Sequence, residues 1–242
     1  AAPAAAEYAA AGASCSFTLR PGTASGEGAL EAAEELIARA FVLAGEFQPL
    51  PEAEARAINA PAGREANGSG CLPSTYLAMP VDDVLAHGGF GLQEGASRVY
   101  DLGAGLGRPT LRAVLLHGAA LGVGVELSES RWRAGCLALK QLDLLLARPS
   151  DRPRGRGPAV VELRRGDALQ ADVSEATHVL LFATCFPASV LQALQRKLLR
   201  ELPSGARVFC AGERGHWQRR LEEGGRALAA AAQAAAGDDD VA

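Results

Sequence analysis

The residues best placed to do chemistry lie in the segment 99–110, VYDLGAGLGRPT. A short apolar run ends at Asp101, three glycines follow at alternate positions, and a helical pattern then begins. A strand, a glycine-rich turn and a helix let the backbone approach a nucleotide-like ligand closely, with the first amides of the helix facing it. We predict that this turn contacts the ligand through Asp101, Gly103, Ala104, Gly105 and Gly107.

The details of the turn favour one kind of ligand. A dinucleotide fingerprint, GxGxxG, would need glycine at the position of Arg108, and the carboxylate of Asp101 would repel a pyrophosphate. A dinucleotide-dependent dehydrogenase is therefore the least favoured interpretation. The carboxylate suits a ligand with an ammonium group and no phosphate, and S-adenosylmethionine has adenine, ribose, a sulfonium and an α-ammonium group.

Two more acidic side chains follow later apolar runs. Glu126 ends the second run, roughly 20 residues after Gly103, where an acid that binds both ribose hydroxyls is expected. Asp167, with Ala168 beside it, follows the third run and is placed to accept the exocyclic amine of adenine. The structural alternative for each acid is a role at the start of the next helix. Three acids at three consecutive strand ends favour the ligand-binding interpretation.

Alternating apolar and amphipathic segments predict the elements that position these residues. We expect strands over 98–102, 121–126, 159–163, 177–182 and 206–211, and helices over 106–117, 128–147 and 188–201. Strands that alternate with helices predict a parallel sheet covered on both faces, with the ligand across the carboxyl ends of the strands.

The composition divides the chain into four expected segments. Residues 1–26, rich in Ala, Ser, Gly and Pro, are expected to be a disordered or low-complexity leader. Residues 27–70 form a helical extension, whose amphipathic helix over 27–46 either packs on the main domain or binds a partner. Residues 71–215 form the ligand-binding domain, and 216–242 form an Ala-rich acidic tail without a further strand.

Charge, length and cysteine usage exclude several classes of protein. The 242 residues carry a net charge of −4, which argues against a nucleic-acid footprint over the whole protein. No apolar run approaches the roughly 18–20 residues that cross a membrane. The five cysteines are widely spaced and odd in number, so we expect reduced, mostly buried thiols with no metal site and no disulfide framework.

The motifs DLGAGLGR, VGVELS and GDAL, with the run ATHVLLFATCF, resemble the class I S-adenosylmethionine-dependent methyltransferases over residues 76–211. The flanking segments resemble the disruptor-of-telomeric-silencing type, the histone lysine methyltransferases without a SET domain. These segments are Thr75-Tyr76, the short helix expected over 80–87, and Thr184-Cys185-Phe186. The resemblance implies a Rossmann-like three-layer α/β/α sandwich with a mainly parallel sheet and an N-terminal helical extension.

The resemblance also implies direct in-line transfer of a methyl group, for which the protein aligns the acceptor and excludes water. Its candidate catalytic residues are Tyr76, Thr184 and Phe186, with the rings of Tyr76 and Phe186 as walls of an acceptor channel. The alternative for Phe186 is a place in the core. The sequence departs from the pattern at Leu77 and Ala78, where the family commonly has Gly and Glu, and no asparagine ends the expected fourth strand. A protein lysine is the leading acceptor. The alternatives are a methyltransferase of small molecules or other macromolecules, and a non-catalytic binder of S-adenosylmethionine.

The expected partner is a protein acceptor, with the nucleosome as one candidate, and no membrane. Direct binding of nucleic acid stays open, because the arginines of the loop 148–158 suit either a solvated connection or a surface for an acidic partner. The resemblance implies an intracellular location, in the nucleus or the cytoplasm.

Overall fold

The computed structural model describes residues 13–20, 27–45, 51–54, 81–86, 90–146, 158–183, 186–212 and 215–220. Its strands are β1 (Ser14–Leu19), β2 (Arg98–Leu102), β3 (Leu121–Glu126), β4 (Ala159–Arg165), β5 (His178–Phe182), β6 (Arg207–Gly212) and β7 (Gly215–Arg220). Its helices are α1 (Glu27–Leu43), α3 (Val81–Ala86), α4 (Arg108–Leu115), α5 (Glu129–Leu145) and α6 (Ala188–Glu201). These bounds confirm every strand and helix predicted between residues 98 and 211, most of them to within two residues at each end.

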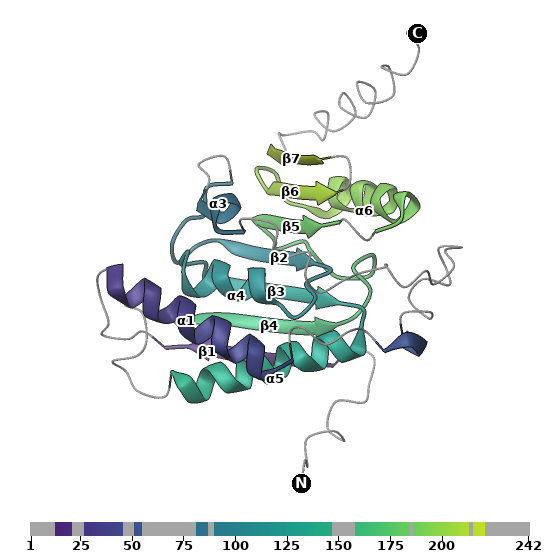
Figure 1. The fold of residues 1–242 in the computed structure, drawn as a ribbon. Coiled ribbons are helices and arrows are strands. Elements are labelled where there is room, and N and C mark those ends of the chain that lie inside the picture. The colour runs from purple at the N-terminus through teal and green to yellow at the C-terminus, as the bar shows by residue number, and fades with distance from the viewer. Residues whose placement is uncertain are drawn as a thin grey trace, which may run out of the picture.

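The strands form one seven-stranded sheet in the order β1-β4-β3-β2-β5-β6-β7 (Figure 1). The five central strands are parallel, and β1 and β7 pair antiparallel at the two edges. The direction of strand addition reverses between β2 and β5, which is the switch point of a Rossmann-like sheet. This order confirms the predicted α/β fold class, and it places the carboxyl ends of β2 to β6 along one edge.

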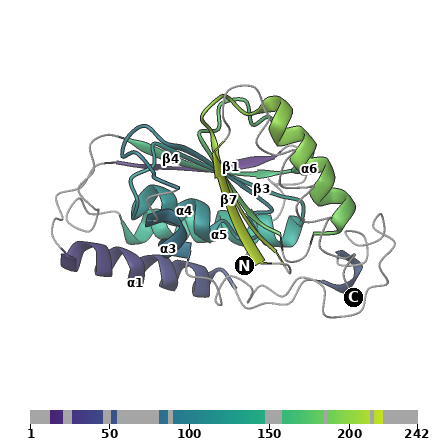
Figure 2. The ribbon, with the colours of Figure 1, turned by 90° about the horizontal axis from the view of Figure 1, so that it is seen from above.

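Helices cover both faces of the sheet, as the sandwich requires (Figure 2). Helices α1, α3, α4 and α5 lie on one face, and α4 buries Leu111 and Val114 there. Helix α6 lies on the other face and buries Leu194 and Leu198. Strand β5 is buried along its whole length because both of its faces are covered.

Helix α4 approaches β3 closely because β3 has a glycine beneath it. A Cβ atom on Gly122 would lie 2.9 Å from the backbone oxygen of Thr110. Helix α1 packs against α5 and buries Ile37 and Phe41 completely. The packing interpretation of the amphipathic helix is therefore confirmed.

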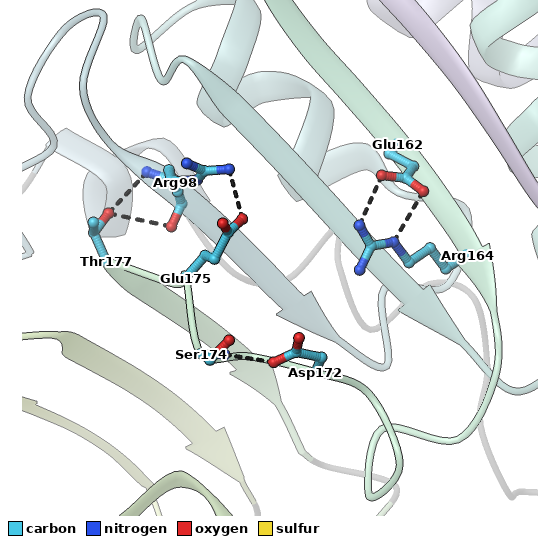
Figure 3. Close-up of polar contacts among 7 residues, drawn as sticks. All are labelled: Arg98, Glu162, Arg164, Asp172, Ser174, Glu175 and Thr177. Carbon is cyan, nitrogen blue, oxygen red and sulfur yellow. Dashed lines mark hydrogen bonds and ion pairs between the residues drawn. The ribbon is translucent and has the colours of Figure 1, made fainter. Parts of the chain in front are cut away.

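The connection from β4 to β5 crosses the second face of the sheet without forming a helix. Two ion pairs lie on this face (Figure 3). Arg98 of β2 donates to Glu175 at 2.7 Å, and Arg164 of β4 donates to both carboxylate oxygens of Glu162 at 2.9 Å. Their side chains are partly exposed, so the described residues leave this part of the face polar.

The prediction of a disordered leader over residues 1–26 is wrong for residues 13–20, the part of it that the structure describes. Ser14–Leu19 form β1, which runs antiparallel to β4 and buries Phe17 and Leu19. The segment alternates polar and apolar residues with the period of a strand, but it does so inside a composition rich in Ala, Gly and Ser. Antiparallel pairing with β4 supplies the backbone hydrogen bonds that the composition alone did not predict.

The boundary placed at residue 215 is also wrong, because β7 extends the sheet past it. Gly215–Arg220 pair with β6 from Gly212 back to Arg207. This edge strand contains basic and polar residues, and the backbone ladder forms without the apolar run on which the strand predictions depended. The rest of the expected tail lies outside the described residues.

A disulfide corrects the expectation of reduced thiols. Cys15 of β1 and Cys136 of α5 are bonded, with Cα atoms 5.9 Å apart. The two positions are 121 residues apart in the chain, and such a pairing cannot be recognised from sequence spacing. Cys210 is free and buried.

No described helix is long and apolar enough to cross a membrane. Within the same part of the chain, no group of three or more His, Cys, Asp or Glu side chains is arranged to hold a metal ion.

Candidate functional site

The glycine turn after β2 is tied to the end of β3. The amides of Gly103 and Ala104 both donate to the carbonyl of Val125, at 2.9 and 3.0 Å. The turn therefore begins where the carboxyl ends of two central strands meet, beside the switch point of the sheet.

Two glycines of the turn could not be replaced by a residue with a side chain. Each has a left-handed backbone φ, and at each position an added Cβ atom would overlap a neighbouring side chain. Gly107 precedes α4 with a φ of 84°, and a Cβ there would lie 2.5 Å from Cδ2 of Leu163. Gly103 has the same φ, and its Cβ would lie 2.6 Å from Cζ of Phe186. The structure thus brings the ring of Phe186, one of the predicted catalytic residues, into contact with the turn.

Asp101 lies fully buried at the end of β2. Its Oδ2 accepts a hydrogen bond from the hydroxyl of Thr110 at 3.0 Å, whereas its Oδ1 is buried with no hydrogen-bond partner among the described residues. Burial raises the pKa of this carboxyl to about 7, and the nearby Glu126 adds to that rise, against the opposing bond from Thr110. The unsatisfied oxygen is an acceptor for a positively charged group.

Glu126 joins the turn to the start of α5. Its Oε2 accepts from the amide of Gly105 at 2.7 Å, and its Oε1 accepts from the amide of Ser128 at 2.8 Å. Burial raises the pKa of this carboxyl, although the two amides oppose the rise. Each carboxylate oxygen keeps a second lone pair, so these two bonds leave acceptors for a ligand.

The first turn of α5 lies beside Glu126. Ser128 is the N-cap, and its Oγ accepts from the amide of Arg131 at 3.2 Å. The side chain of Leu127 is 51% exposed, although it follows a buried strand. No role for Leu127 was predicted, although VGVELS places an apolar residue directly after Glu126, the predicted ribose acid.

Glu54, in the extension before the main domain, was not among the predicted residues either. Its carboxylate accepts hydrogen bonds at the same helix start, from the hydroxyl of Ser128 and the amide of Ser130. No motif surrounds Glu54, so the sequence holds no signal for this contact.

Asp167 and Ala168 follow β4 at the same edge of the sheet. The amide of Gly166 donates to the backbone carbonyl of Glu126 at 3.0 Å, so the two strand ends are adjacent. Asp167 is exposed, and its Oδ1 accepts from the amide of Leu169 at 2.9 Å. Its predicted contact with adenine stays a prediction.

The remaining predicted residues divide into two groups. Tyr76 and Thr184 lie outside the described residues. Arg108, which breaks the dinucleotide pattern, lies with Cζ 5.1 Å from the ring centroid of Phe41 in α1.

This arrangement fits a ligand that carries both a cation and hydroxyl groups. Two buried carboxyl groups, Asp101 and Glu126, lie close enough for one to shift the pKa of the other, at the glycine turn. One of their oxygens is unsatisfied, and an exposed apolar side chain lies beside them. The two carboxyl groups, when ionised, would repel a phosphate.

Comparison with known proteins gives a partial match. No protein-family model matches the chain. A protein-lysine N-methyltransferase of Saccharolobus islandicus (strain REY15A) is 32% identical over 110 residues, which are 46% of this chain and 58% of the relative. The chain therefore matches only a little over half the length of this curated relative.

Solved structures show a distant likeness. An S-adenosylmethionine-dependent methyltransferase from Geobacter sulfurreducens, in complex with S-adenosyl-L-homocysteine, is 19% identical, with a TM-score of 0.43 over 67% of this chain and 56% of that chain. PKMT2 from Rickettsia typhi is 19% identical, with a TM-score of 0.38 over 55% of this chain and 24% of that chain. At these TM-scores the likenesses add no argument about function.

Proposed function

We propose that this chain is an S-adenosylmethionine-dependent methyltransferase that acts on a protein lysine. The observation that carries the proposal is the pair of buried acids at the glycine turn, Asp101 with an unsatisfied oxygen and Glu126 beside it. Both lie at strand ends beside the switch point, where open α/β sheets bind their ligands.

The turn after β2 and the ends of β3 and β4 offer residues for the ammonium group, the ribose and the adenine of this cofactor. Asp101 would hold the α-ammonium group, and Glu126 would hold the ribose hydroxyls through its remaining lone pairs. Asp167 and Ala168 would contact adenine, against which the exposed side chain of Leu127 would pack. When bound, S-adenosylmethionine supplies an electrophilic methyl group on a sulfonium.

The protein's own contribution is alignment and exclusion of water. The ring of Phe186, which contacts Gly103, would form one wall beside the methyl-donor end of the site, and Tyr76 and Thr184 would complete the acceptor channel. A lysine must lose its proton before it attacks, and an apolar channel lowers the pKa of an amine.

The protein-lysine methyltransferase of Saccharolobus islandicus supports a lysine acceptor. A histone or nucleosome as the acceptor, and a location in the nucleus or the cytoplasm, rest on the family resemblance. The departures at Leu77 and Ala78 favour a second candidate, a binder of the cofactor that transfers no methyl group.

Calorimetric titration with S-adenosylmethionine and S-adenosylhomocysteine tests the cofactor. We expect the wild-type chain to bind both, Asp101→Ala to lose binding, and Asp143→Ala, an exposed acid on α5, to bind like wild type. Binding of NAD in place of both ligands would contradict the proposal.

A methyl-label assay against nucleosomes and a protein extract tests the acceptor. Label on lysine supports the proposal, label on a small molecule or another macromolecule changes the substrate class, and cofactor binding without label identifies the binder.

A further inference from the structure

We propose that Glu54, from the N-terminal extension, is a positioning residue that holds the loop 126–128 in place for the cofactor ribose. The inference rests on the proposed function, because it concerns the same cofactor site. It adds a requirement that no motif of the sequence suggests: part of the extension must dock before the ribose acid is in place.

The contacts of Glu54 are short and reach across the chain. Its Oε1 accepts from the hydroxyl of Ser128 at 2.8 Å and from the amide of Ser130 at 3.0 Å, across sequence separations of 74 and 76 residues. The helical segment 52–54, the short dark-blue ribbon of Figure 1, lies apart from α1 and near the carboxyl end of β4.

These contacts continue to the proposed ribose acid. The hydroxyl of Ser128 points to Glu54 while its amide donates to Oε1 of Glu126 at 2.8 Å. The other oxygen of Glu126 accepts from Gly105 in the turn at 2.7 Å. A single series of hydrogen bonds therefore runs from the extension, through the start of α5, to the glycine turn.

The charge of Glu54 suits this place. Burial alone would raise its pKa, but hydrogen bonds from Ser130 and Ser128 outweigh it and lower the pKa below the ordinary 4.5. Glu54 is thus ionised at neutral pH, where a negative charge at a helix start is favourable. The amide of Ser130 donates to Glu54 and the amide of Ser128 donates to Glu126, so each carboxylate binds its own amide at this helix start.

A simple helix cap is the structural alternative for Glu54. Ser128 already caps α5 by accepting from the amide of Arg131, so a role for Glu54 in folding alone would appear as lower stability of the ligand-free protein. A positioning role appears instead in cofactor affinity, and only while Glu126 is present.

The test is a double-mutant cycle between Glu54→Gln and Glu126→Gln in the full chain, with S-adenosylhomocysteine as the probe. We expect Glu54→Gln to raise the Kd about tenfold, which is the size of a lost charge-assisted hydrogen bond. In the Glu126→Gln background the same change is expected to cost less than about twofold, because the two residues act as one unit. Glu31→Gln, an exposed glutamate on α1, is the matched control and is expected to bind like wild type.

A second readout separates positioning from catalysis and from folding. With saturating acceptor, Glu54→Gln is expected to raise KM for S-adenosylmethionine and to leave kcat within about twofold. Thermal unfolding checks that each variant folds. If Glu54→Gln leaves the Kd unchanged, or raises it equally in the Glu126→Gln background, the positioning role of Glu54 is overturned. The proposed function is not affected by that result. Failure of the wild-type chain to bind overturns the proposed function, and this inference with it.

Discussion

The carboxyl group of Asp101 lies where an ionised group is costly, since it is completely buried and one of its oxygens has no described partner. With a pKa of about 7, it is protonated in roughly half of the molecules at neutral pH. A cationic ligand would favour the ionised form and satisfy the free oxygen. The ligand-free protein therefore carries a cost in stability that the proposed cofactor would remove.

Replacement of Asp101 by asparagine is expected to remove a pH dependence of stability. The folded pKa of about 7 is raised above the ordinary 3.8, so the stability from the neutral carboxyl is fully present below pH 3.8 and is lost as the pH rises through 7. That shift corresponds to at most about 4 kcal/mol. The asparagine side chain would stay uncharged and keep an acceptor for Thr110, so the stability of Asp101→Asn relative to wild type is expected to increase by a few kcal/mol between about pH 4 and pH 8.

Urea unfolding of both proteins at pH 4, 6 and 8 measures this difference. A difference in unfolding free energy that stays constant over the range would show that Asp101 is ionised throughout. The same variant is expected to bind the proposed cofactor much more weakly, since the neutral amide lacks the negative charge that would pair with the ammonium group.

Gly107 is expected to tolerate no side chain. Alanine there would combine a left-handed φ of 84° with a Cβ atom 2.5 Å from Leu163. The backbone angle costs about 1–2 kcal/mol and the overlap about 1–3 kcal/mol, so Gly107→Ala is expected to lower the unfolding free energy by about 2–5 kcal/mol. Gly166→Ala is the matched control, because nothing lies within 4 Å of its added Cβ. Equal denaturation midpoints for the two variants would contradict this account.

Strand β1 is held to the sheet by its backbone ladder with β4 and by the disulfide between Cys15 and Cys136. The disulfide closes a loop of 121 residues, which contains β2 and β3, the strands of the two buried acids. Reduction is therefore expected to lower the unfolding free energy by about 2–5 kcal/mol. Burial raises the pKa of the free thiol of Cys210 to about 11, so this thiol is a poor nucleophile for exchange with the disulfide.

Thermal unfolding with and without dithiothreitol measures this contribution. The double variant Cys15→Ser/Cys136→Ser is the control, and its midpoint is expected not to respond to the reductant. If the wild-type midpoint is equally insensitive, the two thiols are not joined in solution.

Strands β3 and β5 were predictable because they are nearly continuous apolar runs, which parallel strands buried on both faces require. The edge strands β1 and β7 were not, because an edge strand is partly exposed and its backbone ladder tolerates polar residues. The same distinction holds in the site. Asp101 and Glu126 could be predicted because strand ends and the glycine spacing lie within one local stretch. Glu54 could not, because a contact across 74 residues leaves no local pattern.

The residues of the proposed site come from distant parts of the chain. The extension contributes Glu54, β2 and β3 contribute the two buried acids, and the segment after β5 contributes Phe186. Cofactor binding, protonation and folding all involve the carboxyl group of Asp101. A change in the pKa of Asp101 is therefore expected to change both the cofactor affinity and the free energy of unfolding.

Binding of the proposed cofactor is therefore expected to release protons. With a pKa of about 7, Asp101 is mostly protonated at pH 6 in the free protein, and an ammonium group beside it favours the ionised form. Binding of S-adenosylhomocysteine at pH 6 is expected to release close to one proton, and its affinity is expected to rise with pH until about pH 7 and then level off. Calorimetry in two buffers with different ionisation enthalpies counts these protons directly. Identical binding heats in the two buffers at pH 6 have two explanations. If Asp101 is already ionised before the ligand arrives, the raised pKa is overturned; if the ammonium group binds elsewhere, Asp101 is removed from the proposed site.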